Sequence, residues 1–572
     1  MKNDIITLEI TDVTPEGFGV GRIDGKVYFV ADTVSGDICE CIVLKELKSH
    51  SFAKLVNIKK PSLYRIDPDC TVCRQCGGCV YRHISYEYEL ILKQNTVKQA
   101  FSRIAKAEID VNPTVHSLPD RYRNKVQYPF AVGEGEKAVF GYYASRSHRI
   151  VKHKSCPLQD PLFTEIAESI AAVADKLNVQ AYDEESGNGI LRHAVMRKNR
   201  KNELLLCLVV TKKHRNLELL AEAVADRHKE IIGVHINLNK RRDNVIFGEE
   251  TYCLLGSEVL TDTLCGKTFE ISPRAFYQVN ADMAEKLYLH AKELAKTEKN
   301  SATILDLYCG AGTIGLSLAG ENDRLCGVEI IDAAIENAHR NARLNGRSEK
   351  NTLFVCGDAS VGVEECKRKF GKPDIIIVDP PRKGLDKEVI ETAVKACPEK
   401  IVYISCDPAT LARDCAIFAE FGYFTSEATP FDLFPRTGHV ETALCLSKKA
   451  HHEMNLNPAP FEKIKNGQKT IELRLYDKKR RLIKVGDTIT FTNNANGETL
   501  STAVKKLHRF DSFSELYSSL PLLQCGYTPE NIERAHPSDM DRYYTPEAQS
   551  KHGVVGIELC LIKPITDEGG VV

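Results

Sequence analysis

The chain has 572 residues, of which 43% are hydrophobic and 27% charged, values typical of a globular protein in water. Its 77 lysine and arginine residues balance its 78 aspartate and glutamate residues, so the net charge gives no sign of a nucleic-acid partner. Binding of nucleic acid would have to come from local basic patches. Residues 1–6 contain no apolar signal segment, and no apolar run is long enough to cross a bilayer. We therefore expect a cytoplasmic protein of three or four domains with no membrane partner.

The first 59 residues alternate apolar and polar side chains between glycine turns. Runs of strand length occupy residues 7–13, 26–30 and 38–47. Short alternating strands separated by frequent turns are typical of small β-barrels. The sequence therefore predicts a β-barrel domain over residues 1–59.

Cysteines recur at every third position after this barrel, at Cys70, Cys73, Cys76 and Cys79, and Cys156 follows at a distance. Thiolates at two-residue gaps can surround one metal centre, and the C-x2-C-x2-C run has the spacing of bacterial ferredoxins, which favours an iron–sulfur cluster. Zinc is the alternative, because paired C-x2-C units also bind zinc. Four ligands from one short loop would be cramped, which favours a distant fourth ligand.

The region around and after the cysteines mixes both kinds of secondary structure. Helical patterns cover residues 86–103 and 161–176, and strand-like runs cover residues 203–211 and 231–237. We predict a central α+β domain over residues 60–275 that carries the cysteine loop.

From about residue 276 the pattern becomes strand, turn and helix, repeated. Five apolar runs have strand length, at residues 302–307, 325–329, 352–356, 374–378 and 400–405. Helical stretches separate most of them, which is typical of a doubly wound α/β domain. We predict this domain over residues 276–448, then a polar linker at 447–452 and a last unit of mixed α and β structure over 453–572.

A glycine turn and three carboxylates indicate a cofactor site in the α/β domain. Gly310 and Gly312 let the chain pass close to a ligand after the first strand. Glu329 ends the second apolar run, where an acid can bind ribose hydroxyls, and Asp358 and Asp379 end the third and fourth. Such strand ends line the crevice in which doubly wound sheets bind ligands. NAD stays possible, because Gly315 completes G-x-G-x-x-G, whereas Asp379-Pro380-Pro381 favours S-adenosylmethionine.

Cys406 follows the fifth apolar run, in the segment Ser405-Cys406-Asp407-Pro408. A thiol beside a bound cofactor indicates nucleophilic, covalent chemistry. Such a thiol must ionise, so we expect surroundings that lower its pKa.

Five motifs together resemble the uracil-C5 RNA methyltransferase family. They are Phe276-Tyr277-Gln278-Val279-Asn280, Asp306-Leu307-Tyr308-Cys309-Gly310-Ala311-Gly312, Asp379-Pro380-Pro381-Arg382, Ser405-Cys406-Asp407-Pro408 and His439-Val440-Glu441-Thr442. The resemblance covers residues 1–447 and is greatest to the 23S ribosomal RNA type that carries an iron–sulfur cluster. It implies an OB-like TRAM domain, which binds RNA, for the barrel, and a Rossmann-like S-adenosylmethionine-dependent methyltransferase domain.

The same resemblance assigns roles to residues by position. Four residues would contact S-adenosylmethionine: Gln278, Tyr308, Glu329 and Asp379. Cys406 would be the nucleophile and Glu441 the general base. The four ligands of a [4Fe-4S] cluster would be Cys70, Cys76, Cys79 and Cys156, which leaves Cys73 outside the family pattern.

The implied reaction begins when the Cys406 thiolate attacks uracil C6, which makes C5 nucleophilic toward the methyl group of S-adenosylmethionine. Glu441 then removes the C5 proton and the cysteine leaves. We expect the target uridine to be flipped out of its stack. The partner is RNA, with 23S ribosomal RNA favoured over transfer RNA and no DNA expected. Alternatives are cytosine-C5 methylation, RNA binding without catalysis, and a NAD-linked oxidoreductase.

Residues 453–572 resemble an ASCH domain, a PUA-like β-barrel associated with RNA. The matching run is Gly467-Gln468-Lys469-Thr470-Ile471-Glu472-Leu473-Arg474. Some ASCH relatives hydrolyse acylated cytidine, which makes Lys469 and Glu472 candidate active residues; the alternative is a charged pair on the surface.

Overall fold

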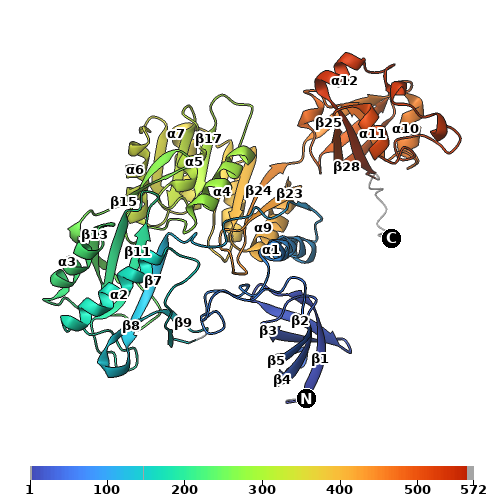
Figure 1. Ribbon diagram of the computed structural model, residues 1–572. Helices are drawn as coiled ribbons and strands as arrows, with labels where there is room; N and C mark the ends of the chain where they lie inside the picture. Colours follow the sequence, from blue (N-terminus) through green and yellow to red (C-terminus); the bar gives the residue numbers. More distant parts are fainter. Residues whose placement is uncertain (1–2, 146, 563–572) are drawn as a thin grey trace. The chain divides into compact units, whose positions relative to one another are not determined.

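The computed structural model describes residues 3–145 and 147–562, and the chain divides into two compact units (Figure 1). One unit comprises Met1–Ile417 with Glu427–Cys445, and the other comprises Phe418–Ser426 with Leu446–Val572. Within the described ranges, no helix is both long and apolar enough to cross a membrane.

The N-terminal part of the first unit is a closed five-stranded barrel with the strand order β1-β2-β3-β5-β4. The strands are β1 (Ile5–Val13), β2 (Phe18–Ile23), β3 (Lys26–Ala31), β4 (Ile38–Glu46) and β5 (His50–Lys60). Alternate side chains fill its interior, including Leu8, Ile10, Val30, Cys39 and Cys41. The barrel expected from the alternating pattern is therefore confirmed.

A long helix and a mixed sheet form the middle of the chain. The predicted helix at 86–103 is α1 (Tyr86–Ala100), which continues as a π-helical turn (Phe101–Ala105). The sheet has the order β14-β13-β12-β11-β7-β8. Its strands are β7 (Lys125–Val132), β8 (Ala138–Phe140), β11 (Leu191–Lys198), β12 (Leu204–Val210), β13 (Ile231–Leu238) and β14 (Glu250–Gly256). Helices α2 (Pro161–Lys176) and α3 (Leu217–Arg227) share one hydrophobic core with the sheet.

Two small hairpins complete this middle region. The pairs are β9 (Tyr142–Tyr143) with β10 (Ile150–Val151), and β15 (Leu260–Leu264) with β16 (Lys267–Ile271). Strand and helix together support the α+β character expected for this part of the chain.

The doubly wound domain expected from the strand–helix repeat is built on a nine-stranded sheet. Its main path is β19-β18-β17-β20-β21-β24-β23-β6, and β22 (Tyr423–Phe424) pairs with β24. The strands are β6 (Asp110–Val111), β17 (Thr303–Leu307), β18 (Arg324–Glu329), β19 (Thr352–Cys356), β20 (Ile375–Val378), β21 (Lys400–Ser405), β23 (Glu427–Phe431) and β24 (Glu441–Lys448). The first five in this path are parallel, and the order reverses between β17 and β20. Ligands bind at such a reversal in doubly wound sheets.

One helix precedes β17, and five more follow strands of this sheet. They are α4 (Ala281–Leu294), α5 (Thr313–Leu318), α6 (Asp332–Leu344), α7 (Ala359–Phe370), α8 (Lys387–Lys395) and α9 (Pro408–Glu420). The doubly wound α/β fold predicted from the five apolar runs is therefore confirmed.

The second unit carries an open five-stranded sheet of order β25-β27-β28-β29-β26, which forms a half-barrel. The strands are β25 (His451–Leu456), β26 (Ile471–Leu475), β27 (Thr488–Asn493), β28 (Thr499–Phe510) and β29 (Val554–Leu561), with helices α10 (Pro458–Lys465), α11 (Phe513–Ser519) and α12 (Pro546–His552). The polar linker expected at 447–452 is wrong, because β24 runs to Lys448 and β25 starts at His451. Polar side chains there stand on the exposed faces of strands, a pattern that resembles a linker in sequence.

Candidate active site

The parallel strands bring the predicted site residues to one edge of the sheet. Tyr308 follows β17, Glu329 ends β18, Asp379 follows β20, and Cys406 follows β21. Because parallel strands all point the same way, their carboxyl ends share an edge, and these four side chains lie along it. Gln278 comes from the segment before α4, and its side chain bonds to Tyr288, a tyrosine whose pKa is raised by burial and by nearby Asp379.

The turn after β17 depends on unusual backbone conformations. Tyr308, Gly310 and Gly312 have φ values of 67°, 53° and 78°. Glycine adopts such angles freely, whereas tyrosine does so at a cost, and strained residues of this kind cluster at functional sites. A Cβ at Gly315 would lie 2.8 Å from Asp306 Oδ2, the atom to which Gly315 N donates a hydrogen bond of 2.9 Å.

Glu329 is tied to this turn by backbone hydrogen bonds. Its Oε2 accepts from Gly310 N at 3.3 Å, and its Oε1 accepts from Ile330 N at 2.9 Å and Ile331 N at 3.1 Å. The carboxylate is therefore held between the glycine turn and the end of β18.

Asp358 has a visible structural role. Its Oδ1 accepts from Ser360 N at 2.9 Å and from Val361 N at 3.0 Å, which caps α7. Hydrogen bonds from Ser360 and the backbone lower the pKa of its carboxyl. The capping contact favours the ionised form of the Asp358 side chain at the end of the third strand. A contact between Asp358 and a cofactor stays a prediction.

Cys406 lies beside a group of buried carboxyls. Burial raises the pKa of its thiol to about 11, nearby Glu441 and Asp379 contribute in the same direction, and Arg382 opposes them. Burial and Asp379 raise the pKa of Glu441 to about 8, again opposed by Arg382, and burial raises the pKa of Asp379 to about 7. The expected lowering of the thiol pKa is therefore wrong for this structure, because burial and two carboxyls outweigh the one opposing cation.

Arg382 and His439 lie near Cys406, and the sequence analysis treated both only as parts of motifs. Arg382 Nη2 lies 3.2 Å from His439 Nε2. Burial, Arg382 and Lys93 lower the pKa of His439, so this ring is neutral at pH 7 and its Nε2 can accept from Arg382. The signal for Arg382 was its position directly after Asp379-Pro380-Pro381.

An open cavity of about 920 Å³ extends over Cys406. Its walls come from the barrel, the cysteine loop, α1 with its π-helical turn, and the loop before β24: Pro15, Glu16, Phe18, Gly77, Gly78, Val80, Thr96, Gln99, Ala100, Arg103, Ile104, Thr437, Gly438, His439 and Val440. Gly438 permits this arrangement, because a Cβ there would lie 1.8 Å from Pro15 O. The thiol is therefore accessible from a space that the barrel helps to form.

The cysteines of the predicted metal centre raise one another's pKa values. Burial raises the pKa of Cys79 to about 12, with contributions from Cys156, Cys76 and Cys70. Burial also raises the pKa of Cys156 to about 11, with contributions from Cys76 and Cys70, and Gly78 N donates to Cys76 Sγ at 3.4 Å. Burial raises the pKa of Cys73, and among the cysteines Cys70 contributes to this rise.

A set of four thiols has the donor chemistry of an iron–sulfur site. In the part of the chain that the structure describes, however, no group of three or more His, Cys, Asp or Glu side chains is arranged to hold a metal ion. The cluster therefore stays a prediction.

Family models match three segments of the chain. Residues 85–449 match the model described as tRNA (uracil-5-)-methyltransferase, residues 1–56 match the TRAM domain, and residues 454–563 match the ASCH domain. The chain belongs to the tRNA (uracil-5-)-methyltransferase family. It is an S-adenosylmethionine-dependent RNA (uracil-5-)-methyltransferase, and the NAD-linked alternative is wrong.

Relatives in this family cover most of the chain. Uncharacterized RNA methyltransferases of Staphylococcus aureus and Halalkalibacterium halodurans are both 38% identical, over 454 and 453 residues, which is 78% of this chain and 99% and 98% of theirs. The crystal structure of Pyrococcus abyssi tRNA (uracil-54, C5)-methyltransferase with S-adenosyl-L-homocysteine is 25% identical with a TM-score of 0.62, and covers 77% of this chain and all of that one.

The ASCH unit buries the charged pair that the sequence analysis singled out. Lys469 Nζ lies 2.9 Å from Glu472 Oε2, and Arg474 Nε lies 2.9 Å from Glu472 Oε1. The side chains of Lys469 and Glu472 are only 11% and 6% exposed, so the interpretation as a surface pair is wrong. They line a cavity of about 680 Å³.

Proposed function

We propose that this enzyme methylates uracil C5 in 23S ribosomal RNA through a covalent bond between Cys406 Sγ and uracil C6. The observation that carries the proposal is the cavity over Cys406, whose walls include the RNA-binding type of barrel and Arg103. A nucleotide flipped from its stack fits a recessed thiol of this kind. The cysteine loop in the same wall, by resemblance, favours the ribosomal RNA type.

Each residue of the site has one role in the reaction. Cys406 Sγ forms a bond to C6, and the electron pair of the C5–C6 double bond moves toward C5 and O4. S-adenosylmethionine, when bound, supplies the methyl group that C5 takes. Glu441 accepts the C5 proton, the C5–H pair restores the double bond, and the C6–S bond breaks with its pair returning to Cys406.

The ends of the parallel strands hold the methyl donor. Glu329 is oriented by backbone N–H groups to bind the ribose hydroxyls, and Asp358 is ionised at the next strand end. Gln278, Tyr308 and Asp379 complete the set of contacts. Asp379 and Glu441 are both buried, and their carboxyls suit a site that receives a positively charged sulfonium.

Arg382 is expected to set the pH dependence of the reaction. Glu441 must be ionised to accept a proton and Cys406 must lose its proton, so kcat of the wild type should rise about tenfold per pH unit from about pH 6 to 8. Arg382 lowers both pKa values, so in the Arg382→Gln enzyme the rise of kcat should move to higher pH, and kcat at neutral pH should be roughly tenfold lower.

Methylation rates measured across this pH range with saturating methyl donor test the role of Arg382. The control is Lys383→Gln, which removes the neighbouring exposed cation. If the rate of the Arg382→Gln enzyme rises over the same pH range as that of the wild type, Arg382 does not act on the thiol or the base.

Cys70, Cys76, Cys79 and Cys156 hold a [4Fe-4S] cluster that shapes the RNA-binding wall of the cavity. The proposed reaction transfers no electrons, so the cluster has a structural role. The Cys79→Ala protein, prepared without oxygen, should lose most of its iron and its visible cluster absorption, whereas Cys73→Ala should keep both. Zinc in place of iron in the wild type, or equal iron loss in the two variants, would contradict this assignment.

The substrate is tested by incubating the enzyme with labelled S-adenosylmethionine and either 23S ribosomal RNA or total transfer RNA, followed by mass mapping of the RNA. Label on uracil C5 of ribosomal RNA is expected. Label confined to transfer RNA would support the competing substrate, which the description of the family and the Pyrococcus abyssi relative favour. Label on cytosine would contradict both.

A further inference from the structure

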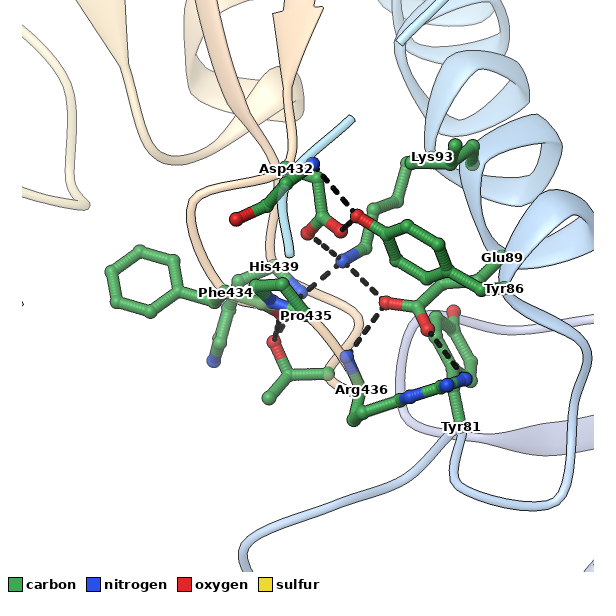
Figure 2. A network of polar contacts seen from close by, with 12 residues as sticks. Tyr81, Tyr86, Glu89, Lys93, Asp432, Phe434, Pro435, Arg436 and His439 are labelled. Atoms are coloured by element: carbon green, nitrogen blue, oxygen red, sulfur yellow. Dashed lines mark hydrogen bonds and ion pairs between the residues drawn. The ribbon is translucent and has the colours of Figure 1, made fainter. Parts of the chain in front are cut away.

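Four charged side chains are buried together where α1 meets the loop before Glu441 (Figure 2). Lys93 and Arg436 carry positive charge, and Glu89 and Asp432 carry negative charge. The side chains of Glu89 and Asp432 are fully buried, and those of Lys93 and Arg436 are 1% and 9% exposed. The four charges balance, as a buried group requires.

The ammonium group of Lys93 uses all three of its donors. It donates to Glu89 Oε1 at 2.8 Å, to Phe434 O at 3.2 Å, and to Asp432 Oδ1. Tyr86 OH donates to the other oxygen of Asp432 at 2.6 Å. Because the donors of a lysine are few and directional, this arrangement selects one position for the loop residues that accept from it.

Glu89 holds the loop at Arg436, two residues after Phe434. Its Oε1 accepts from Arg436 N at 2.7 Å, and its Oε2 lies 3.6 Å from Arg436 Nη1. Arg436 O in turn accepts from Val80 N at 2.9 Å and from Tyr81 N at 3.2 Å. The first half of the loop is therefore bound on both sides, by α1 and by the segment before it.

This loop connects β23 to β24, and Glu441 is the first residue of β24. Phe431 at the end of β23 pairs with Glu441, so residues 432–440 form the connection between paired strands. A hairpin connection needs no buried charge to form, and buried ion pairs are often no better for stability than apolar residues. Their better-supported use is to select one geometry among several.

We propose that Glu89 and Lys93 are positioning residues for Glu441: together with Asp432 and Arg436 they hold the loop so that the carboxylate reaches the C5 proton. This rests on the role proposed above for Glu441. A general base must lie within hydrogen-bond distance of the proton it removes, so a displaced loop slows this step.

The backbone around the nucleophile is held by contacts of its own. Cys406 lies between β21 and α9, where Asp407 Oδ1 accepts from Ala409 N at 2.8 Å and Thr410 N at 3.0 Å. Loss of the network should therefore leave bond formation between Cys406 and C6 in place and slow the later proton removal. The methylated RNA then stays attached to the enzyme.

The Lys93→Met enzyme tests this separation. With RNA and S-adenosylmethionine, the fraction of enzyme covalently bound to methylated RNA on a denaturing gel should rise severalfold, and release of product should fall roughly 100-fold. Glu441→Gln should behave in the same way. The matched control is Lys98→Met, which removes an exposed lysine from the same helix and should release product at the wild-type rate.

A second variant controls for misfolding of the Lys93→Met enzyme. Lys93→Met leaves two buried carboxylates with one cation, whereas Glu89→Gln combined with Lys93→Met leaves one of each. The double variant should also accumulate the adduct. Wild-type release in both, or parallel loss of adduct and turnover in both, would overturn the positioning role. Absence of any adduct from wild-type and Glu441→Gln enzyme would instead contradict the covalent mechanism.

Discussion

The Cys406→Ala enzyme is expected to lose methylation of RNA almost completely, with kcat lowered roughly ten-thousand-fold or more. Uracil C5 becomes nucleophilic only after a bond forms at C6, and alanine cannot form that bond. The variant should still bind S-adenosylmethionine with the affinity of the wild type, because Glu329 and the glycine turn are unchanged. Transfer of label from the methyl donor to RNA, and donor binding by calorimetry, measure the two quantities.

The control for this change is Cys253→Ala, which removes a partly buried thiol on β14, outside the site. It should methylate RNA at the wild-type rate. Substantial methylation by Cys406→Ala would show that no covalent bond to Cys406 is needed. Loss of donor binding in the same variant would mean that the substitution disturbs the crevice as well as the chemistry.

The Glu441→Gln enzyme is expected to stop after methyl transfer. Glutamine has nearly the same shape but cannot accept the C5 proton, so turnover should fall between about 100-fold and 10,000-fold while the covalent complex accumulates. The contribution of Glu441 to the pH profile, from a pKa of about 8 in the wild type, should disappear. Single-turnover gels with labelled RNA, which count covalent and released RNA, check both results.

Glu388→Gln, a change of the same type at an exposed position on α8, should release product normally. If Glu441→Gln releases methylated RNA at the wild-type rate, another group removes the proton. Asp379 is then the candidate base, because it lies near enough to Glu441 to raise the pKa of that carboxyl. Its own pKa of about 7 would let it accept a proton.

The strands of the methyltransferase sheet could be predicted well from the sequence, for a physical reason. Strands β17, β20 and β21 are covered on both faces, so each appears as a short, almost continuous apolar run. Strand β5 of the barrel was not predicted, because only its first half alternates between buried and exposed residues. Strand β6 has two residues and joins β23 from more than three hundred positions away, so it has no local signal.

The sequence by itself determined the types of element, the strand-end residues of the crevice, and Cys406 and Glu441 as candidates, because these depend on local pattern and motif. Only the tertiary structure decided what surrounds them. Glu89 and Lys93 are spaced like any ion pair on an exposed helix. They become a buried contact with Asp432 and Arg436 because folding brings α1 against a loop about 340 positions away. That contact depends on packing between distant segments, which no local pattern records.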